Sequence, residues 1–187
     1  SFGGLQLEVK GDLSSGNVFE SGATLLFSGQ QQIWTVDGPI NLSRLQIAQE
    51  GSEPSVSIQS SAGPSVLTIS DNVNLVNGIV DLRENVLKLP GTVGFTRNVA
   101  SGTQSHFVGS VIHNVPGGST GSFVFPVGSQ NDYKPLSLTF STPLISATEL
   151  MVQHVSHSSS ARQGLPLTAP GGQIVVDSAP FEWSLVS

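Results

Sequence analysis

The feature that most constrains this fold is a series of short runs in which apolar and polar residues alternate. Glycine and glycine-proline pairs punctuate the runs and mark turns. Alternation puts every second side chain on one face of a strand, and no window keeps the spacing of an amphipathic helix. The chain is therefore predicted to be all-β, with early strands at Leu5–Val9, Thr24–Phe27, Ile33–Val36, Leu45–Ile47, Val56–Ile58, Val66–Ile69, Val73–Val76, Ile79–Leu82 and Val86–Leu89.

Strands this short form either an antiparallel sandwich or the coils of a parallel solenoid. The runs between residues 73 and 89 resemble one another as weak repeats, and their aliphatic side chains would stack from coil to coil. We therefore predict a short right-handed parallel β-solenoid (β-helix) with Leu82, Leu87 and Leu89 in its core. On strand spacing alone, an antiparallel sandwich through this half is the alternative.

The second half has longer strands and longer loops. Its clearest signature runs from Phe123 to Phe140, where two alternating strands flank a turn and a polar loop. Pro126 has no N–H to donate to a neighbouring strand, so it ends the first strand, and Gly128 lets the backbone reverse. We predict an antiparallel β-sandwich at 96–187, after a solenoid region at 1–95.

Composition excludes several classes of function. Only 11% of residues are charged, against about 25% in ordinary soluble domains, and the net charge is −6. Without a basic stripe, the chain is not expected to bind nucleic acid or anionic membranes.

No run approaches the roughly 18 apolar residues of a membrane span, so no membrane insertion is expected. Ser1 opens the chain without Met or a charged signal region, as expected of a mature product or an excised fragment.

A further set of sequence motifs spans most of the chain. These motifs are Phe27-x-Gly29-x-x-Gln32-Ile33, Leu75-x-x-Gly78-Ile79-x-x-Leu82, Phe125-Pro126-Val127-Gly128, Tyr133-Lys134-Pro135-Leu136 and Phe181-Glu182-Trp183-Ser184-Leu185. Through them the first half resembles solenoid repeats of large secreted surface proteins of Bacteroidetes, the cargo of the type IX secretion system, and the second half resembles the module that often follows those repeats. This resemblance implies a repeated, adhesin-like surface architecture rather than a reaction.

No constellation for catalysis or metal binding stands out. Cysteine is absent, which removes thiolate ligands and cysteine nucleophiles. His154 and His157 are three apart on a strand, so they point to opposite faces, and the loop at Asp71 has too few carboxylates for a tight calcium site. No Gly-x-Ser-x-Gly elbow appears. We therefore predict no catalytic residue, no metal and no cofactor.

Aromatic residues are the remaining candidates for ligand binding. Trp34, Tyr133 and Trp183 could stack on sugar rings, although packing in the core or between modules explains the tryptophans as well. Ser178 lies in an Asp-Ser-apolar triplet that resembles the O-glycosylation motif of Bacteroidetes secreted proteins. Structural roles are predicted for Phe125, Pro126, Gly128, Tyr133, Pro135 and Trp183.

These observations favour a non-enzymatic structural or adhesive segment of a large secreted or cell-surface protein. The expected location is extracellular or on the outer cell surface. Its partners would be other domains of the same protein or neighbouring copies, with extracellular carbohydrate as a further candidate. The alternatives are a carbohydrate-binding module that uses exposed aromatics, and a small β-helical polysaccharide hydrolase or lyase.

Overall fold

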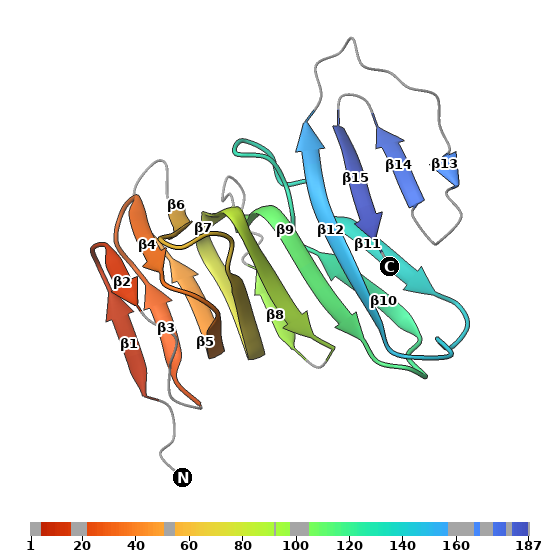
Figure 1. Cartoon of the computed structure of the whole chain (residues 1–187), viewed down its shortest axis with the longest axis horizontal. Coiled ribbons are helices and arrows are strands. Elements are labelled where there is room, and N and C mark those ends of the chain that lie inside the picture. Colours follow the sequence, from red (N-terminus) through yellow and green to blue (C-terminus); the bar gives the residue numbers. More distant parts are fainter. Residues whose placement is uncertain are drawn as a thin grey trace.

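A computed structural model describes residues 5–15, 22–50, 55–91, 93–97, 105–156, 167–168, 174–178 and 181–186. These residues form strands and no helix, so the all-β prediction is confirmed (Figure 1). None of the described segments is a helix long and apolar enough to cross a membrane. The strands are β1 (Gln6–Val9), β2 (Leu13–Ser15), β3 (Thr24–Phe27), β4 (Gln32–Val36), β5 (Ile40–Ala48), β6 (Ser55–Ser60), β7 (Val66–Pro90), β8 (Gly94–Arg97), β9 (Ser105–Val115), β10 (Gly121–Phe125), β11 (Leu136–Phe140), β12 (Thr148–Ser156), β13 (Leu167–Thr168), β14 (Ile174–Ser178) and β15 (Phe181–Val186).

Three faces of stacked parallel strands build the first part of the molecule. The first face stacks β1, β3, the second part of β5, the middle of β7 and then β8. The second face stacks β2, β4, β6, a later part of β7 and the start of β9. The third joins the first part of β5 to the start of β7, and the end of β7 to β9. The predicted parallel β-solenoid is therefore confirmed, with about three turns.

Apolar columns along the solenoid hold the coils together. Residues paired across parallel strands point to the same side of the sheet, so Val9, Phe27, Ile47 and Leu75 form one continuous buried column. Burying each such side chain stabilises the fold by about 1.5–3 kcal/mol relative to exposure. The leucines predicted for the core are all buried: Leu82, Leu87 and Leu89.

Polar side chains line the corner between the first and second faces. Gln49 Nε2 donates to Gln32 Oε1 at 3.2 Å, and Gln32 Nε2 donates to the carbonyl oxygens of Val9 and Gly11. Gly78 lies at the same corner with φ 129°, where an added Cβ would be 2.8 Å from Gln49 Oε1. The amides satisfy backbone groups that leave the strand ladder where the chain turns.

After β9 the chain changes from parallel to antiparallel pairing. β12 pairs with β9, β15 with β12, β14 with β15 and β13 with β14, all antiparallel, so the third face continues as an antiparallel sheet (Figure 1). β10 and β11 form a separate two-stranded antiparallel sheet. The predicted antiparallel sandwich is not confirmed, because the described strands beyond residue 96 extend the solenoid's own sheet and add only this two-stranded one.

The β10–β11 pair closes the C-terminal end of the solenoid core. Phe125 is fully buried at the end of β10 and belongs to the same core cluster as the inward side chains of β9 and β12. His113 of β9 packs edge-on against Phe123 and Phe125, with ring centroids 5.4 and 5.9 Å apart. One core thus runs past the boundary expected near residue 95, and the division into regions 1–95 and 96–187 stays a prediction.

Candidate functional site

Trp34, the first aromatic candidate, lies in the core of the second face and has 0% of its surface exposed. Its ring centroid is 5.5 Å from that of Phe27, and its Nε1 donates to Ser15 Oγ at 2.7 Å. A sugar ring needs an exposed aromatic face. Trp34 is therefore a packing residue in the folded chain and offers no platform for carbohydrate.

Tyr133 is half-buried at the end of the second face. The guanidinium carbon of Arg97 lies 3.8 Å from the centroid of the Tyr133 ring, and the ring of His106 is centred 5.9 Å away. Burial raises the pKa of Tyr133, and the Arg97 charge opposes that rise. A cation over the ring contributes about 0.5–2 kcal/mol, so this aromatic face already has an occupant from the chain itself.

The predicted turn at Phe125–Gly128 adds a further rung to the second face. Val127 bridges to Phe107 in the parallel sense, and Gly128 bridges to Tyr133 in the antiparallel sense. The Gly128 N–H donates to the Phe107 carbonyl oxygen at 3.0 Å. All four residues of the turn are buried, and the structural roles of Phe125, Pro126 and Gly128 stay predictions.

Gly128 is required by its surroundings rather than by its dihedral angles. An added Cβ would lie 2.1 Å from the Asp132 carbonyl oxygen and 2.8 Å from His106 Cδ2. The segment 129–132 is itself a tight turn, in which the N–H groups of Asn131 and Asp132 both donate to Ser129 Oγ. Residues 126–133 therefore form a close-fitting cover over the last coil.

His106 lies beneath this cover with 0% of its surface exposed. Its Nε2 donates to the Ser129 carbonyl oxygen at 2.6 Å, and its Nδ1 has no hydrogen-bond partner among the described residues. Burial lowers the pKa of His106, and the positive charges of Arg97 and His154 lower it further. The Ser129 carbonyl and Asp132 oppose the decrease. The hydrogen bond from His106 therefore holds residues 126–133 in place, and burial keeps the imidazole away from any substrate.

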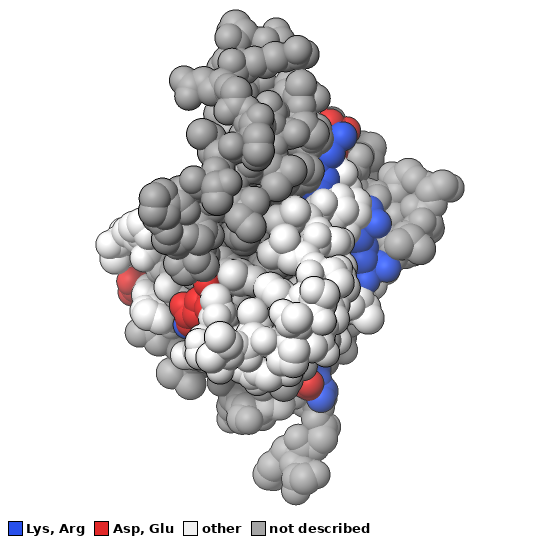
Figure 2. Space-filling model, turned by 90° about the vertical axis from the view of Figure 1, so that its right-hand side faces the viewer, with Lys and Arg blue, Asp and Glu red and all other residues white. Residues whose placement is uncertain are grey.

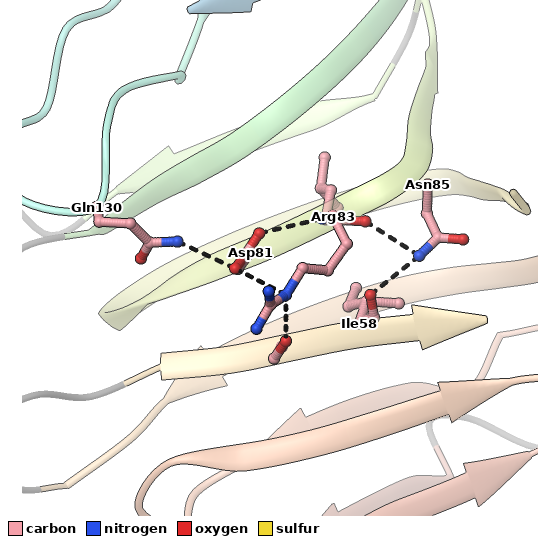
Figure 3. Close-up of polar contacts among 7 residues, drawn as sticks. Ile58, Asp81, Arg83, Asn85 and Gln130 are labelled. Atoms are coloured by element: carbon pink, nitrogen blue, oxygen red, sulfur yellow. Dashed lines mark hydrogen bonds and ion pairs between the residues drawn. The ribbon is translucent and has the colours of Figure 1, made fainter. Parts of the chain in front are cut away.

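A second polar network ties the same cover to the preceding coil (Figure 3). Gln130 Nε2 donates to Asp81 Oδ2 at 3.0 Å, and Asp81 is also paired with Arg83. Arg83 turns with a positive φ of 55°; its N–H donates to Asp81 Oδ1, and its Nε donates to Ser57 Oγ on β6. Both carboxylate oxygens of Asp81 therefore accept hydrogen bonds, one from Arg83 in its own coil and one from Gln130 in the cover.

Asn85 lies two residues after Arg83 and, unlike Arg83, is buried (Figure 3). Its Nδ2 donates to the carbonyl oxygens of Ile58 and Leu82, each at 3.0 Å. Its Oδ1 accepts from the Ser65 N–H at 2.9 Å. One amide thus satisfies backbone groups from three segments where β7 turns from the second face to the third.

Charged side chains are few on the surface, and some of them form ion pairs. Figure 2 shows a face on which most of the described surface is uncharged, with acidic and basic residues in small groups. Exposed pairs of this kind each contribute about 0–1 kcal/mol. Ion pairs among the described residues include Lys10 with Glu8, Arg44 with Asp71, Arg83 with Asp81, and Lys88 with Glu149.

The residues considered for metal binding do not come together. His154 is half-buried on β12, where burial and then the Lys134 charge lower its pKa, while His157 lies outside the described residues. Asp71 accepts a hydrogen bond from Arg44 Nε at 2.5 Å. Within the described part of the chain, no group of three histidine or acidic side chains is arranged to hold a metal ion.

The remaining predicted residues lie in the C-terminal strands and the loop before β11. Trp183 of β15 stands opposite His154 on one side and Val176 on the other. Ser178 ends β14 and pairs in register with Phe181 of β15. Pro135 is exposed between Tyr133 and β11.

Sequence reasoning missed the polar residues around these aromatics. Local sequence patterns did not indicate a role for His106, because its partners come from residues 126–133, and they did not indicate one for Arg97, although it lies over the Tyr133 ring.

A scan against models of protein families, together with searches of curated proteins and of solved structures, found no match.

The stability of the chain is expected to fall below about pH 6.5, the ordinary pKa of histidine. Burial lowers the pKa values of His106, His113 and His154, so the unfolded chain binds more protons than the folded one in this range. The stabilising contribution is complete above pH 6.5 and is lost as pH falls towards the lowered values. Urea midpoints measured from about pH 8 to about pH 5 would show this slope.

The His106→Gln variant is the matched control for that slope. A glutamine amide can still donate to the Ser129 carbonyl but does not titrate, so the acid-side decrease should become shallower while His113 and His154 maintain part of it. An unchanged slope would show that His106 is not held neutral by its burial.

Proposed function

We propose that this chain is a non-enzymatic structural and adhesive segment of a large secreted or cell-surface protein, working outside the cell or on its outer surface. The proposal rests on one observation: the side chains that could act in catalysis or ligand binding make contacts within the fold instead. His106, Asp81 and Trp34 are all engaged in joining coil to coil or cover to coil. A catalytic or binding site would instead present such groups in an accessible cleft.

The motif resemblance and the surface composition support the same proposal. A right-handed, adhesin-like solenoid of the Bacteroidetes secreted type would work through stiffness and repeated surface, and this chain has few charges and a continuous stacked core. We also propose that β10 and β11 act as the second layer of a small sandwich over β9 and β12. The contacts of His113 with Phe123 and Phe125 support that arrangement.

A glycan array, with turnover assays on polysaccharide, ester and peptide substrates, tests the proposal. We expect no turnover, and binding that is weak and spread over many glycans, as for a surface that works through multiple copies. Saturable binding of one glycan class, lost in Tyr133→Ala but retained in Tyr133→Phe, would contradict the proposal and favour a carbohydrate-binding module. Turnover lost in Asp81→Asn would favour the hydrolase or lyase alternative.

A further inference from the structure

Residues 121–140, which we call the lid, are joined to the rest of the described chain by a small number of hydrogen bonds. The lid consists of β10, the cover and β11, and its two strands form a sheet of their own. Backbone bonds to Phe107 and the bond from Gln130 to Asp81 attach it to the coils. A unit attached in this way can open before the whole molecule unfolds.

The two ends of the lid meet at a narrow neck. The Gly118 N–H donates to the Leu144 carbonyl oxygen at 2.8 Å, and the Leu144 N–H donates to the Ser119 carbonyl oxygen at 3.2 Å. The segment that enters the lid has positive φ angles of 80° at Gly118 and 106° at Gly121, where glycine lets the backbone turn. The entry and the exit are therefore tied together, and the lid can swing about this neck as one body.

The three histidines of the described residues all lie against the lid. His106 donates to a lid carbonyl oxygen, His113 packs on two lid phenylalanines, and His154 lies near two charged lid residues. The coils before residue 105 contain no histidine, and His157 lies outside the described residues. The side chains that titrate nearest to neutral pH are thus gathered beneath one movable unit.

A proton added to His106 finds no acceptor while the lid is closed. Nε2 already donates to Ser129, so the added proton goes to Nδ1, which has no hydrogen-bond partner among the described residues. The charged groups that face the ring are Arg97 of β8, His154 of β12 and Asp132 of the lid. Burial, the Arg97 charge and a protonated His154 all disfavour a second positive charge here, and Asp132 only partly opposes them.

His113 is enclosed by apolar groups. It stands in register between leucines of β7 and β12 and lies beneath the lid phenylalanines. Burial lowers its pKa, and the Asn114 backbone opposes that decrease. The neighbouring charges, Lys88 of β7 and Glu149 of β12, alternate to the other side of the sheet and pair with each other there. Water reaches a charged His113 only when the lid lifts.

His154 meets charges of both signs from the lid. Burial and then Lys134 lower its pKa, and Asp132 raises it, while the residue in register with it on β15 is a tryptophan. The other titratable groups at the lid stay unchanged near neutral pH. Tyr133 has a raised pKa, and Asp81, which accepts a hydrogen bond from the lid, is already in an ion pair.

We propose that the lid is a pH-operated switch, which stays docked on β9 and β12 at neutral pH and lifts from them in mild acid while the coils stay folded. Lifting gives the three imidazoles access to water and uncovers the inward apolar side chains of β9 and β12. Because burial lowers the histidine pKa values, the closed lid is fully stabilised above about pH 6.5 and loses that stability as pH falls towards the lowered values. The switch goes beyond the proposed function and does not depend on it.

Amide hydrogen exchange of the full 187-residue chain tests the switch. Rates measured from about pH 7.5 to about pH 5 are divided by the intrinsic rate at each pH, which gives a protection factor. Each histidine that takes up a proton on opening raises the open fraction up to about tenfold per pH unit. We expect protection at Phe107 and Gly128, which bond across the edge of the lid, to fall at least about tenfold more than at Ser28 and Gln49 in the early coils.

Dye binding distinguishes lifting of the lid from loss of the coils. The fluorescence of a dye that binds exposed apolar surface should rise over the same pH range, because the inner sides of the lid and of β9 and β12 are uncovered. The far-UV circular dichroism should stay unchanged, since the stacked strands remain paired.

Two variants test whether the buried charges drive the opening. His106→Gln keeps a donor for the Ser129 carbonyl oxygen but takes up no proton, so the acid-dependent loss of protection should become at least about threefold smaller. Lys134→Gln removes a positive charge near His154 and should move the opening to lower pH. Lys10→Gln is the matched control, because Lys10 is exposed in the first coil, and it should leave the opening unchanged.

Three outcomes would overturn the inference: equal loss of protection in the lid and the early coils, lid protection that does not change with pH, or wild-type pH dependence in both His106→Gln and Lys134→Gln. These results are separate from those that test the proposed function. A selective glycan hit would overturn the structural role without changing the exchange rates, whereas a lid that stays closed in acid would remove the switch alone.

Discussion

Replacing Asn85 with alanine is expected to lower the free energy of unfolding by about 3–6 kcal/mol. The substitution strands the Ser65 N–H and the carbonyl oxygens of Ile58 and Leu82 in the interior, and each buried polar group left without a partner costs about 1–3 kcal/mol. Total stabilities of about 5–15 kcal/mol are usual, so this one side chain accounts for a large share. Urea unfolding followed by circular dichroism would measure the loss.

Two further variants isolate the cause of that loss. Asn41→Ala removes the same amide from an exposed position on β5 and should change stability by no more than about 0.5 kcal/mol. Asn85→Asp keeps the size and the acceptor for the Ser65 N–H but cannot donate to the two carbonyl oxygens at neutral pH, so it should also be strongly destabilising. An Asn85→Asp variant as stable as the wild type would refute this account of the corner.

The strand positions were predictable because their signal is local. Alternation and turn residues within a few positions decide whether a segment is a strand, and the core places of Leu82, Leu87 and Leu89 follow from the same alternation. The weak repeat after residue 73 also indicated coils. The parallel pairing of Phe27 with Ile47 and of Ile47 with Leu75 then requires only that like residues stack.

The continuation after β9 was not predictable from the same signals. Longer strands and loops are compatible with a new sandwich and with an extension of an existing sheet, because both satisfy alternation. What decides between them is the far edge of β9, whose backbone groups pair with those of Thr148–Gln153 on β12. That pairing joins residues about 40 positions apart, and no local pattern encodes it.

In the candidate site, too, some features were predictable from the sequence and others were not. The Pro126 and Gly128 turn was visible in the sequence, since proline and glycine restrict or permit particular backbone shapes. Burial of His106 was not visible, because the residues that cover it are Ser129 and its neighbours, more than twenty positions later. The burial of Trp34 was not predictable either, because alternation along a strand separates two faces but does not show which face is buried.

Replacing Trp34 with alanine is expected to destabilise the chain by about 3–5 kcal/mol, the usual range for removing a buried aromatic side chain. Trp34 stands in a column between Leu13 and Ile58, and it packs on Phe27. The cavity would open beneath the first coil, whose strand β2 has only β4 as its partner among the described residues. Amide hydrogen exchange should therefore quicken first in β1 and β2, ahead of global unfolding.

The Trp34→Phe variant separates the volume of the indole from its hydrogen bond. It retains most of the packing but loses the bond from Nε1 to Ser15 Oγ, so the expected loss is only about 1–2 kcal/mol. If Trp34→Ala instead left the urea midpoint unchanged, the ring would have to lie outside the core, and its role as a carbohydrate platform would return. Because the alanine variant is expected to loosen the whole first coil, a glycan that it failed to bind would report unfolding. Tyr133→Ala, at the opposite end of the solenoid, is consequently the sharper probe of ligand binding.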